Sequence, residues 1–231
     1  AIPCKKIVDY LIRNVVRFYE MADEVWIPQA SVEETLREYG YKGKVEVVDN
    51  GNDFADGAPI AELRCVARET LKLSDDEMMF LFVGQHIWEK NLSFLLEALA
   101  RIKEQSFRMY FIGTGYAASE IKQKACELSL MDKITFVGNI TERERLKRYY
   151  AAADLFLFPS LYDNAPLVVR EAAALHTPSL MIRDSTAAEI ISDSSNGFLS
   201  TNNVNAYAER ITELIRQPRL ITRVGDEASR T

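Results

Sequence analysis

Short apolar runs alternate with amphipathic stretches from about residue 60 to the end of the chain. The apolar runs predict buried strands at about 78–83, 109–112, 134–137, 155–158, 179–182 and 197–199. The stretches with helical spacing predict helices at about 60–72, 92–104, 117–129, 142–152, 166–175, 187–192 and 204–216. Strands that alternate with helices form a parallel sheet with right-handed crossovers. The predicted fold class is therefore α/β, a Rossmann-like parallel sheet with helices on both faces.

The first 48 residues follow a different pattern. Apolar residues recur at helical spacing at Ile7, Leu11, Val15, Phe18 and Met21. A short strand is predicted at 24–27, then a helix that begins with a capping box of Ser31 and Glu34, then a strand at 44–48. We interpret residues 1–48 as the tail of one domain and 49–231 as a second domain. The chain lacks an initiator Met, which favours a piece of a longer protein.

A polar loop and a helix follow the strand predicted at 155–158. Pro166 stands where the helix begins, so unpaired N–H groups and a positive dipole end would face a phosphate. Glu171 lies about five residues further, ~7.5 Å along the helix, where it could accept hydrogen bonds from a ribose diol. Asp163 on the loop would reach a second polyol. In a plainer interpretation, Asp163 and Asn164 cap the helix and Glu171 lies on its solvent face.

A second polar loop, residues 84–91, follows the strand predicted at 78–83. Gly84 would let a ligand approach the backbone, and Lys90 could meet a phosphate as a point charge or be an ordinary surface lysine. Gln85 offers a neutral donor. We expect His86 to be an exposed loop residue rather than a catalytic base.

A glycine pattern after the next strand, Gly113-x-Gly115-x-x-Ala118, is typical of dinucleotide sites. Such a site also needs an acidic residue at the end of the following strand, where this chain has Gly138-Asn139. An NAD-dependent oxidoreductase domain is therefore the less favoured alternative.

Taken in order, these stretches resemble the retaining, GT-B-fold nucleotide-sugar glycosyltransferases of the glycosyl transferases group 1 family. The family's two acidic residues, eight positions apart, correspond to Asp163 and Glu171, and His176 stands where its Gly-x-Pro begins. Lys90-Asn91 matches the family's lysine motif, with Gln85 in place of its arginine. Weaker landmarks of the family lie at 50–53, 186–189 and 196–199. In the alternative interpretation, the first is an ordinary Asn-Gly turn and Glu189 is a solvated helix residue.

The resemblance implies the C-terminal donor-binding half of a GT-B fold, with a remnant of the N-terminal acceptor-binding domain. It implies a hexosyltransferase of polysaccharide or glycolipid biosynthesis that uses a UDP- or GDP-linked sugar, retains configuration and needs no metal or other cofactor. The implied catalytic residues are Lys90, Asp163 and Glu171. The implied donor-binding residues also include Gly84, Gln85, Gly113, Phe136, Val137, Gly138, Asn164, Ala165, Pro166, Leu167 and Val168. We expect this chain to bind donor and transfer poorly; a non-catalytic nucleotide-binding module is the other alternative.

The composition of the chain limits the classes of partner that we expect for it. A net charge of −6 without a basic cluster argues against a nucleic-acid binder. No apolar run approaches the ~18 residues of a membrane span, and the three scattered cysteines (Cys4, Cys65, Cys126) indicate reduced thiols. We expect a cytoplasmic protein whose partners are a nucleotide sugar and an unknown carbohydrate or lipid acceptor. Any peripheral contact with a membrane would come through the remainder of the N-terminal domain.

Overall fold

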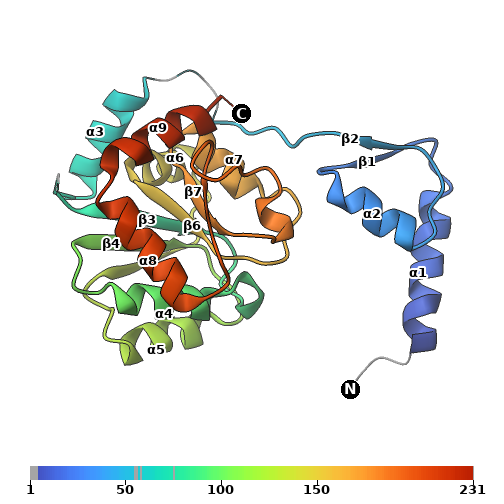
Figure 1. The fold of residues 1–231 in the computed structure, drawn as a ribbon, viewed down its shortest axis with the longest axis horizontal. Coiled ribbons are helices and arrows are strands. Elements are labelled where there is room, and N and C mark those ends of the chain that lie inside the picture. Colours follow the sequence, from blue (N-terminus) through green and yellow to red (C-terminus); the bar gives the residue numbers. More distant parts are fainter. Residues whose placement is uncertain (1–4, 55–56, 58, 75, 231) are drawn as a thin grey trace. The chain divides into compact units, whose positions relative to one another are not determined.

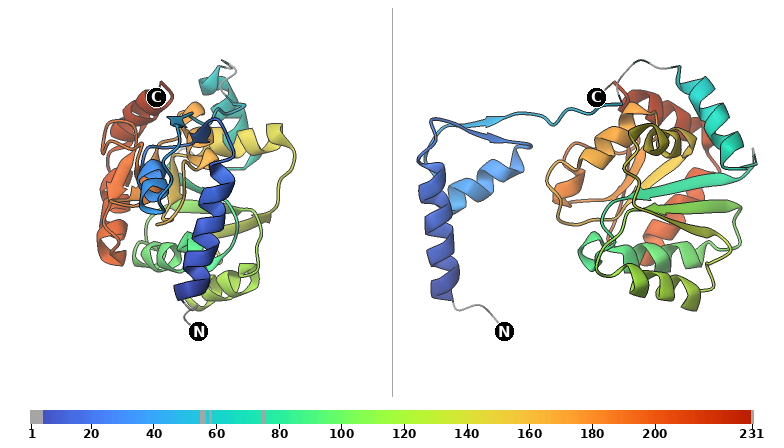
Figure 2. Two further views of the ribbon diagram at one scale, coloured as in Figure 1. Left: turned by 90° about the vertical axis from the view of Figure 1, so that its right-hand side faces the viewer. Right: turned by 180° about the vertical axis from the view of Figure 1, so that it is seen from behind.

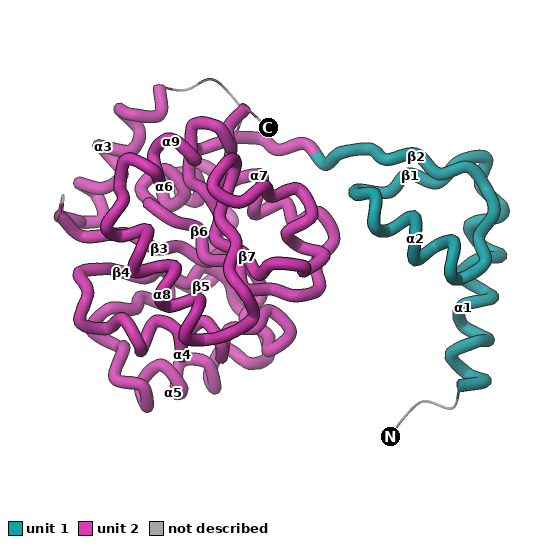
Figure 3. The backbone as a smooth tube through the Cα atoms, in the orientation of Figure 1, with its two compact units in different colours: residues 1–50 teal, residues 51–231 magenta. Residues whose placement is uncertain are grey.

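The structure, a computed structural model, describes residues 5–54, 57, 59–74 and 76–230. Cys4 lies outside the described residues, and Cys65 and Cys126 are free and exposed. The chain divides into two compact units, residues 1–50 and 51–231 (Figure 3). Among the described residues, no helix combines the length and apolar character needed to cross a bilayer.

The described part of the smaller unit contains two helices and two short strands. They are α1 (Lys5–Tyr19), β1 (Val25–Ile27), α2 (Ser31–Glu38) and β2 (Val45–Val47), with β1 and β2 paired in parallel. Its core consists of four buried side chains, Val16, Ile27, Leu36 and Tyr41. The predicted helix and strands are therefore confirmed, but the core that they enclose is small.

Two details of this unit differ from the predictions. The apolar stripe of α1 is exposed, with Leu11 57% and Phe18 70% accessible, because α1 packs on the small core through Val16 instead. The predicted capping box is wrong: Ala30 is the cap residue and already has helical angles, so the turn begins one residue earlier. Ser31 lies in the first turn, where its hydroxyl accepts a hydrogen bond of 2.8 Å from the Gln29 amide.

The larger unit is an α/β domain built on one six-stranded sheet (Figure 1). Its strands are β3 (Met78–Val83), β4 (Phe107–Ile112), β5 (Ile134–Gly138), β6 (Leu155–Phe158), β7 (Ser179–Ile182) and β8 (Phe198–Ser200). Its helices are α3 (Ile60–Thr70), α4 (Leu92–Arg101), α5 (Ala118–Glu127), α6 (Arg143–Ala152), α7 (Leu167–Ala174), α8 (Val204–Ile215) and α9 (Pro218–Ala228), with 3₁₀ turns η1 (Trp88–Lys90) and η2 (Thr186–Ala188). Every strand pair is parallel, which confirms the predicted fold class.

Two helices differ from the predictions. The helix predicted at 187–192 is only the 3₁₀ turn η2, because the Asn196 side chain binds the backbone of this segment. Its oxygen accepts from the Ser192 N–H at 2.7 Å, and its amide donates to the Ile190 carbonyl at 3.0 Å. Helix α9 was not predicted, although Pro218 at its first turn is a helix-start signal.

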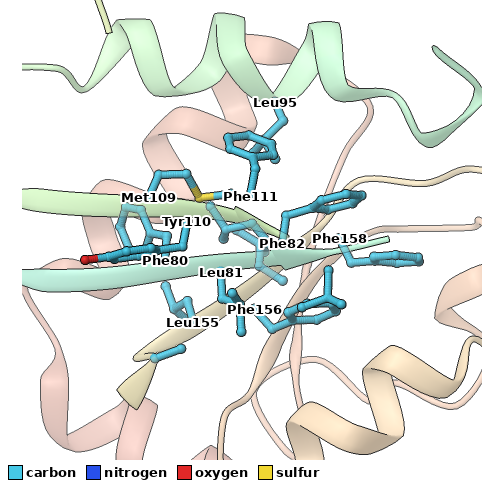
Figure 4. Close-up of a cluster of buried hydrophobic side chains, with 14 of the residues drawn as sticks. Phe80, Leu81, Phe82, Leu95, Met109, Tyr110, Phe111, Leu155, Phe156 and Phe158 are labelled. Carbon is cyan, nitrogen blue, oxygen red and sulfur yellow. The ribbon is translucent and has the colours of Figure 1, made fainter. Parts of the chain in front are cut away.

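The core lies on both faces of the sheet, since nearly every residue of the central strands is buried. Aromatic rings of adjacent strands pack side by side: Phe82 lies 5.8 Å from Phe111 and 6.0 Å from Phe158 between ring centroids. Figure 4 shows these rings beneath Leu95 of α4. Strands buried on both faces read as continuous apolar runs, which is why the sequence reveals them so clearly.

Helices cover both faces of the sheet. Helix α4 packs with α5 and α8 on one face, and α6 packs with α3 and α7 on the other (Figure 2, right panel). The strand order is β5-β4-β3-β6-β7-β8. After β3, the next two strands are placed on one side of it, and β6, β7 and β8 are then placed on its other side. A sheet of this kind opens a crevice beyond the carboxyl ends of the two strands where the order reverses. The loops after β3 and β6 flank that crevice.

Candidate functional site

Backbone packing between two loops explains the glycines of the dinucleotide-like pattern. A Cβ atom at Gly113, whose φ is 127°, would collide with the Gly84 carbonyl, and one at Gly115 would collide with the His86 carbonyl. These glycines therefore let the loop after β4 pack against the loop after β3. Packing between two loops of the chain is therefore enough to explain the glycine pattern.

His86 is buried, and the expectation of an exposed loop residue is wrong. The residue is 2% exposed, and its ring centroid lies about 6 Å from the ring centroids of Phe82, Phe111 and Phe136. Backbone hydrogen bonds turn it inward: its N–H donates to the Thr114 carbonyl at 3.0 Å, and its carbonyl accepts from Ala117 at 3.1 Å. Burial lowers the pKa of His86, and its Nε2 has no hydrogen-bond partner among the residues that the structure describes.

His86 should make the larger unit sensitive to acid. In the unfolded chain, His86 is protonated at a pH near its ordinary pKa of 6.5. In the folded state, it is protonated only at a lower pH. The contribution of neutral His86 to the free energy of unfolding is therefore fully present above pH 6.5. It falls as the pH drops toward the lower folded-state pKa, by at most ~1.4 kcal/mol per pH unit. In urea unfolding at pH 7.0 and 5.5, His86→Leu should lose less of its free energy of unfolding than the wild type does, because the variant has no buried imidazole to protonate. His176→Gln is the control, and equal losses in all three proteins would contradict the assignment.

The loops after β3 and β6 meet in an ion pair. Lys90 Nζ contacts both carboxylate oxygens of Asp163, at 2.6 and 2.8 Å, and lies 5.8 Å from the centre of the Phe158 ring. Both side chains are about four-fifths buried, with 19% and 18% of their surfaces exposed. The Asn91 amide donates to the Pro159 carbonyl at 3.2 Å and joins the same two loops. The structure thus brings two of the predicted site residues together at the point where the strand order reverses.

The loop that carries Asp163 is also attached on its other side. The Asp163 N–H donates to the Thr186 hydroxyl at 3.2 Å. Helix α7 begins with Pro166 as its cap residue, which provides no side-chain acceptor, and the preceding Ala165 has a left-handed φ of 42°. The interpretation of Asp163 and Asn164 as cap residues is therefore wrong. The side chain of the cap residue accepts no hydrogen bond from the first turn of α7. The N–H groups of that turn can therefore face an anion.

Glu171 is buried within α7 and has a partner on each carboxylate oxygen. Arg143 Nη1 lies 2.9 Å from Oε1, and the Tyr150 hydroxyl donates to Oε2 at 2.8 Å. Burial, and then the charge of Glu171, raise the pKa of Tyr150 well above its ordinary value, so Tyr150 remains a donor. The interpretation of Glu171 as a solvent-facing residue is wrong, because only 8% of the residue is exposed.

Arg143 and Tyr150 were missed by the sequence analysis. They are seven residues apart on α6, which places them two turns apart on one side of the helix. That spacing was the available signal, but it indicates a shared helix face and not the carboxylate that the two side chains contact.

The end of β5 carries the remaining predicted residues. Phe111 of β4 pairs with Phe136 of β5, but the next residue, Ile112, pairs with Gly138. The register therefore shifts here, and Val137 is an extra residue in β5. Such a bulge leaves the backbone of the extra residue outside the ladder. Gly138 adopts a φ of 83°, a left-handed conformation that favours glycine. Gln85 is exposed in the loop after β3, and Gly84 is half-buried there.

Comparisons with known proteins agree on one family. The sequence profile of the family described as Glycosyl transferases group 1 matches residues 66–231. An alpha-monoglucosyldiacylglycerol synthase from Streptococcus pneumoniae is 28% identical over 220 residues, covering 91% of this chain and 48% of that protein. A sucrose-phosphate synthase from Thermosynechococcus elongatus superposes with a TM-score of 0.84 and 26% identity over 95% of this chain and 55% of that one. Anabaena HepE, solved in complex with UDP and glucose, gives a TM-score of 0.82 and 19% identity over 96% of this chain and 62% of that one.

Proposed function

Because the chain belongs to the Glycosyl transferases group 1 family, we propose that residues 51–231 bind the nucleotide part of a sugar donor. The donor is a UDP- or GDP-linked hexose. The complete protein transfers this sugar, with retention of configuration, to a carbohydrate or lipid acceptor. The chain spans about half the length of the pneumococcal relative, so we propose the transfer for the whole protein and not for this chain alone. Two comparisons support the donor class: that relative is named a monoglucosyldiacylglycerol synthase, and HepE was solved with UDP and glucose.

The Lys90–Asp163 pair is the observation that carries this proposal. It places a cation and a carboxylate together at the crevice where parallel sheets of this type bind ligands. A diphosphate contains the anion that Lys90 attracts, and the first turn of α7 offers N–H groups to the same phosphates. Asp163 is then the acceptor for a hydroxyl of the transferred sugar.

The two ends of the nucleoside have their own partners in this arrangement. Glu171 accepts hydrogen bonds from the ribose hydroxyls. The backbone at the bulge of Phe136, Val137 and Gly138 meets the edge of the base, since the extra residue leaves polar groups outside the ladder. The donor therefore extends along the carboxyl edge of the sheet, with its base at β5 and its sugar at the loop after β6.

Transfer breaks the bond between the anomeric carbon and the diphosphate oxygen and forms a bond from that carbon to an acceptor hydroxyl oxygen, whose proton passes to the leaving diphosphate. Negative charge develops on the leaving diphosphate. Lys90 and the N–H groups of α7 are fixed donors that stabilise this charge, which is the electrostatic contribution expected of a transferase site. Gln85, a neutral donor, contributes less than a cation would there.

The smaller unit fits the end of an acceptor-binding domain. Its exposed stripe on α1, which includes Leu11 and Phe18, is a surface that the rest of such a domain would cover. We propose that residues 1–50 belong to that domain, and that any approach to a membrane-borne acceptor occurs through its remaining part.

Nucleotide binding to this chain provides the test. UDP or GDP at ten times its dissociation constant should stabilise the larger unit by ~1.4 kcal/mol, measured by urea unfolding with and without the nucleotide. NAD at the same concentration is the control and should have no effect. Stabilisation by NAD without stabilisation by UDP or GDP would overturn the proposal.

Gln85 supports one other candidate, a nucleotide-binding module without catalytic turnover. It stands where the family has an arginine, so one cation near the diphosphate is lost. Release of free sugar or glycosylated acceptor by the full-length protein separates the two functions, because a binding module yields neither.

A further inference from the structure

The two partners of Glu171 reach it from one helix and share one support. Arg143 and Tyr150 both project from α6, and both contact the buried ring of Phe54. The Arg143 guanidinium lies 4.2 Å from the centre of that ring, and the Tyr150 ring packs edge-on against it at 5.9 Å. Phe54 is 3% exposed, so the support is part of the core.

The support is itself held by the residues that begin the larger unit. The Phe54 N–H donates to the Asn52 side chain at 2.9 Å, and Asp53 lies 3.4 Å from Arg143 Nη2. Arg143 therefore connects Glu171 at one end with the turn at 52–54 at the other. Its side chain is 44% exposed, so the guanidinium is not itself part of the core.

The Glu171 carboxylate keeps acceptor capacity for a diol. A carboxylate offers about four acceptor positions, and Arg143 and Tyr150 occupy one on each oxygen. With respect to the described part of the chain, one position per oxygen remains for the two hydroxyls of a ribose. A free glutamate side chain would have to lose its rotamer freedom when it bound those hydroxyls, whereas this one is already held.

We propose that Arg143 and Tyr150 are positioning residues that set the Glu171 carboxylate for the ribose of the donor. The inference rests on the proposed function and deepens it. It gives the turn at 52–54 a supporting role, because Phe54 contacts both positioning residues. Arg143 and Tyr150 act through Glu171 and do not touch the donor.

The test compares nucleotides that differ only in one ribose hydroxyl. Affinities of UDP, 2′-deoxy-UDP, GDP and 2′-deoxy-GDP are measured by calorimetry for the wild type, Arg143→Met, Arg143→Lys and Tyr150→Phe. The wild type should prefer the ribonucleotide, and Arg143→Met should lose roughly tenfold in that preference, as expected for a hydrogen bond to a charged group. Tyr150→Phe should lose part of it, and Arg143→Lys should recover part. Arg145→Met, which changes another exposed arginine of α6, should keep the wild-type preference.

Each other outcome has a defined meaning. If Arg143→Met binds the ribonucleotide more tightly, Arg143 competes with the ribose and the inference is wrong. If it weakens the ribo and deoxy forms equally, Arg143 acts on the base, the phosphates or the fold, and the inference is again wrong. If the wild type binds none of the four nucleotides, the proposed function fails first. A wild type that prefers ribose and an Arg143→Met variant that prefers it equally would overturn the inference alone.

Discussion

Replacing Glu171 with alanine should weaken the binding of UDP or GDP by ~1.5–3 kcal/mol, the usual contribution of hydrogen bonds to a charged group. The same change should also lower the stability of the larger unit. It leaves the buried Tyr150 hydroxyl without its acceptor and Arg143 without its carboxylate. Calorimetric titration gives the first effect and urea unfolding gives the second.

A second variant separates the two effects. Glu171→Gln keeps an oxygen that accepts from Tyr150, so its stability should lie closer to that of the wild type than the stability of the alanine variant does. Its affinity for the ribonucleotide should still fall, because the charge is lost. Glu144→Ala, at an exposed carboxylate of α6, is the matched control and should change neither quantity. Full nucleotide affinity in the folded Glu171→Gln and Glu171→Ala variants would exclude Glu171 from the donor site.

The sheet could be predicted because its strands are buried on both faces. Each then appears as an uninterrupted apolar run, as Met79–Val83 does, and the intervening helices keep their spacing. The segment at 187–192 failed for a local reason. Its apolar residues suggested a helix, but a single asparagine side chain at 196 satisfies the backbone that a helix would have bonded internally.

Side-chain partners could not be predicted in the same way. The positions of Lys90, Asp163 and Glu171 at the carboxyl edge of the sheet follow from the order of strands and loops. That Lys90 contacts Asp163, while Glu171 contacts Arg143, depends on distances between residues that are far apart in the chain. His86 is the clearest case: a polar residue in a loop was expected to be exposed, and backbone hydrogen bonds to the neighbouring loop bury it.

Lys90→Ala should weaken nucleoside-diphosphate binding by ~1.5–3 kcal/mol, since the diphosphate loses a charged donor. Lys122→Ala, which removes an exposed lysine of α5, is the control and should lose less affinity. The Lys90 variant has a second cause of weaker binding. Asp163 would lose the cation that contacts both of its oxygens, and its uncompensated charge would then lie beside the phosphates. Nucleoside monophosphates should be affected less than diphosphates if Lys90 meets the outer phosphate.

Gln85→Arg should have the opposite effect. Arginine adds a planar donor fork that grips two phosphate oxygens, so affinity for UDP or GDP should rise and become more sensitive to salt. Titrations at 20 and 200 mM salt compare the wild type, Gln85→Arg and Lys90→Ala. The affinity should depend most steeply on salt in Gln85→Arg and least steeply in Lys90→Ala. A neutral glutamine is exposed at this position, so the substitution disturbs no buried group. If Gln85→Arg binds no tighter than the wild type and Lys90→Ala binds as well as it, the diphosphate does not lie between the loop after β3 and the start of α7.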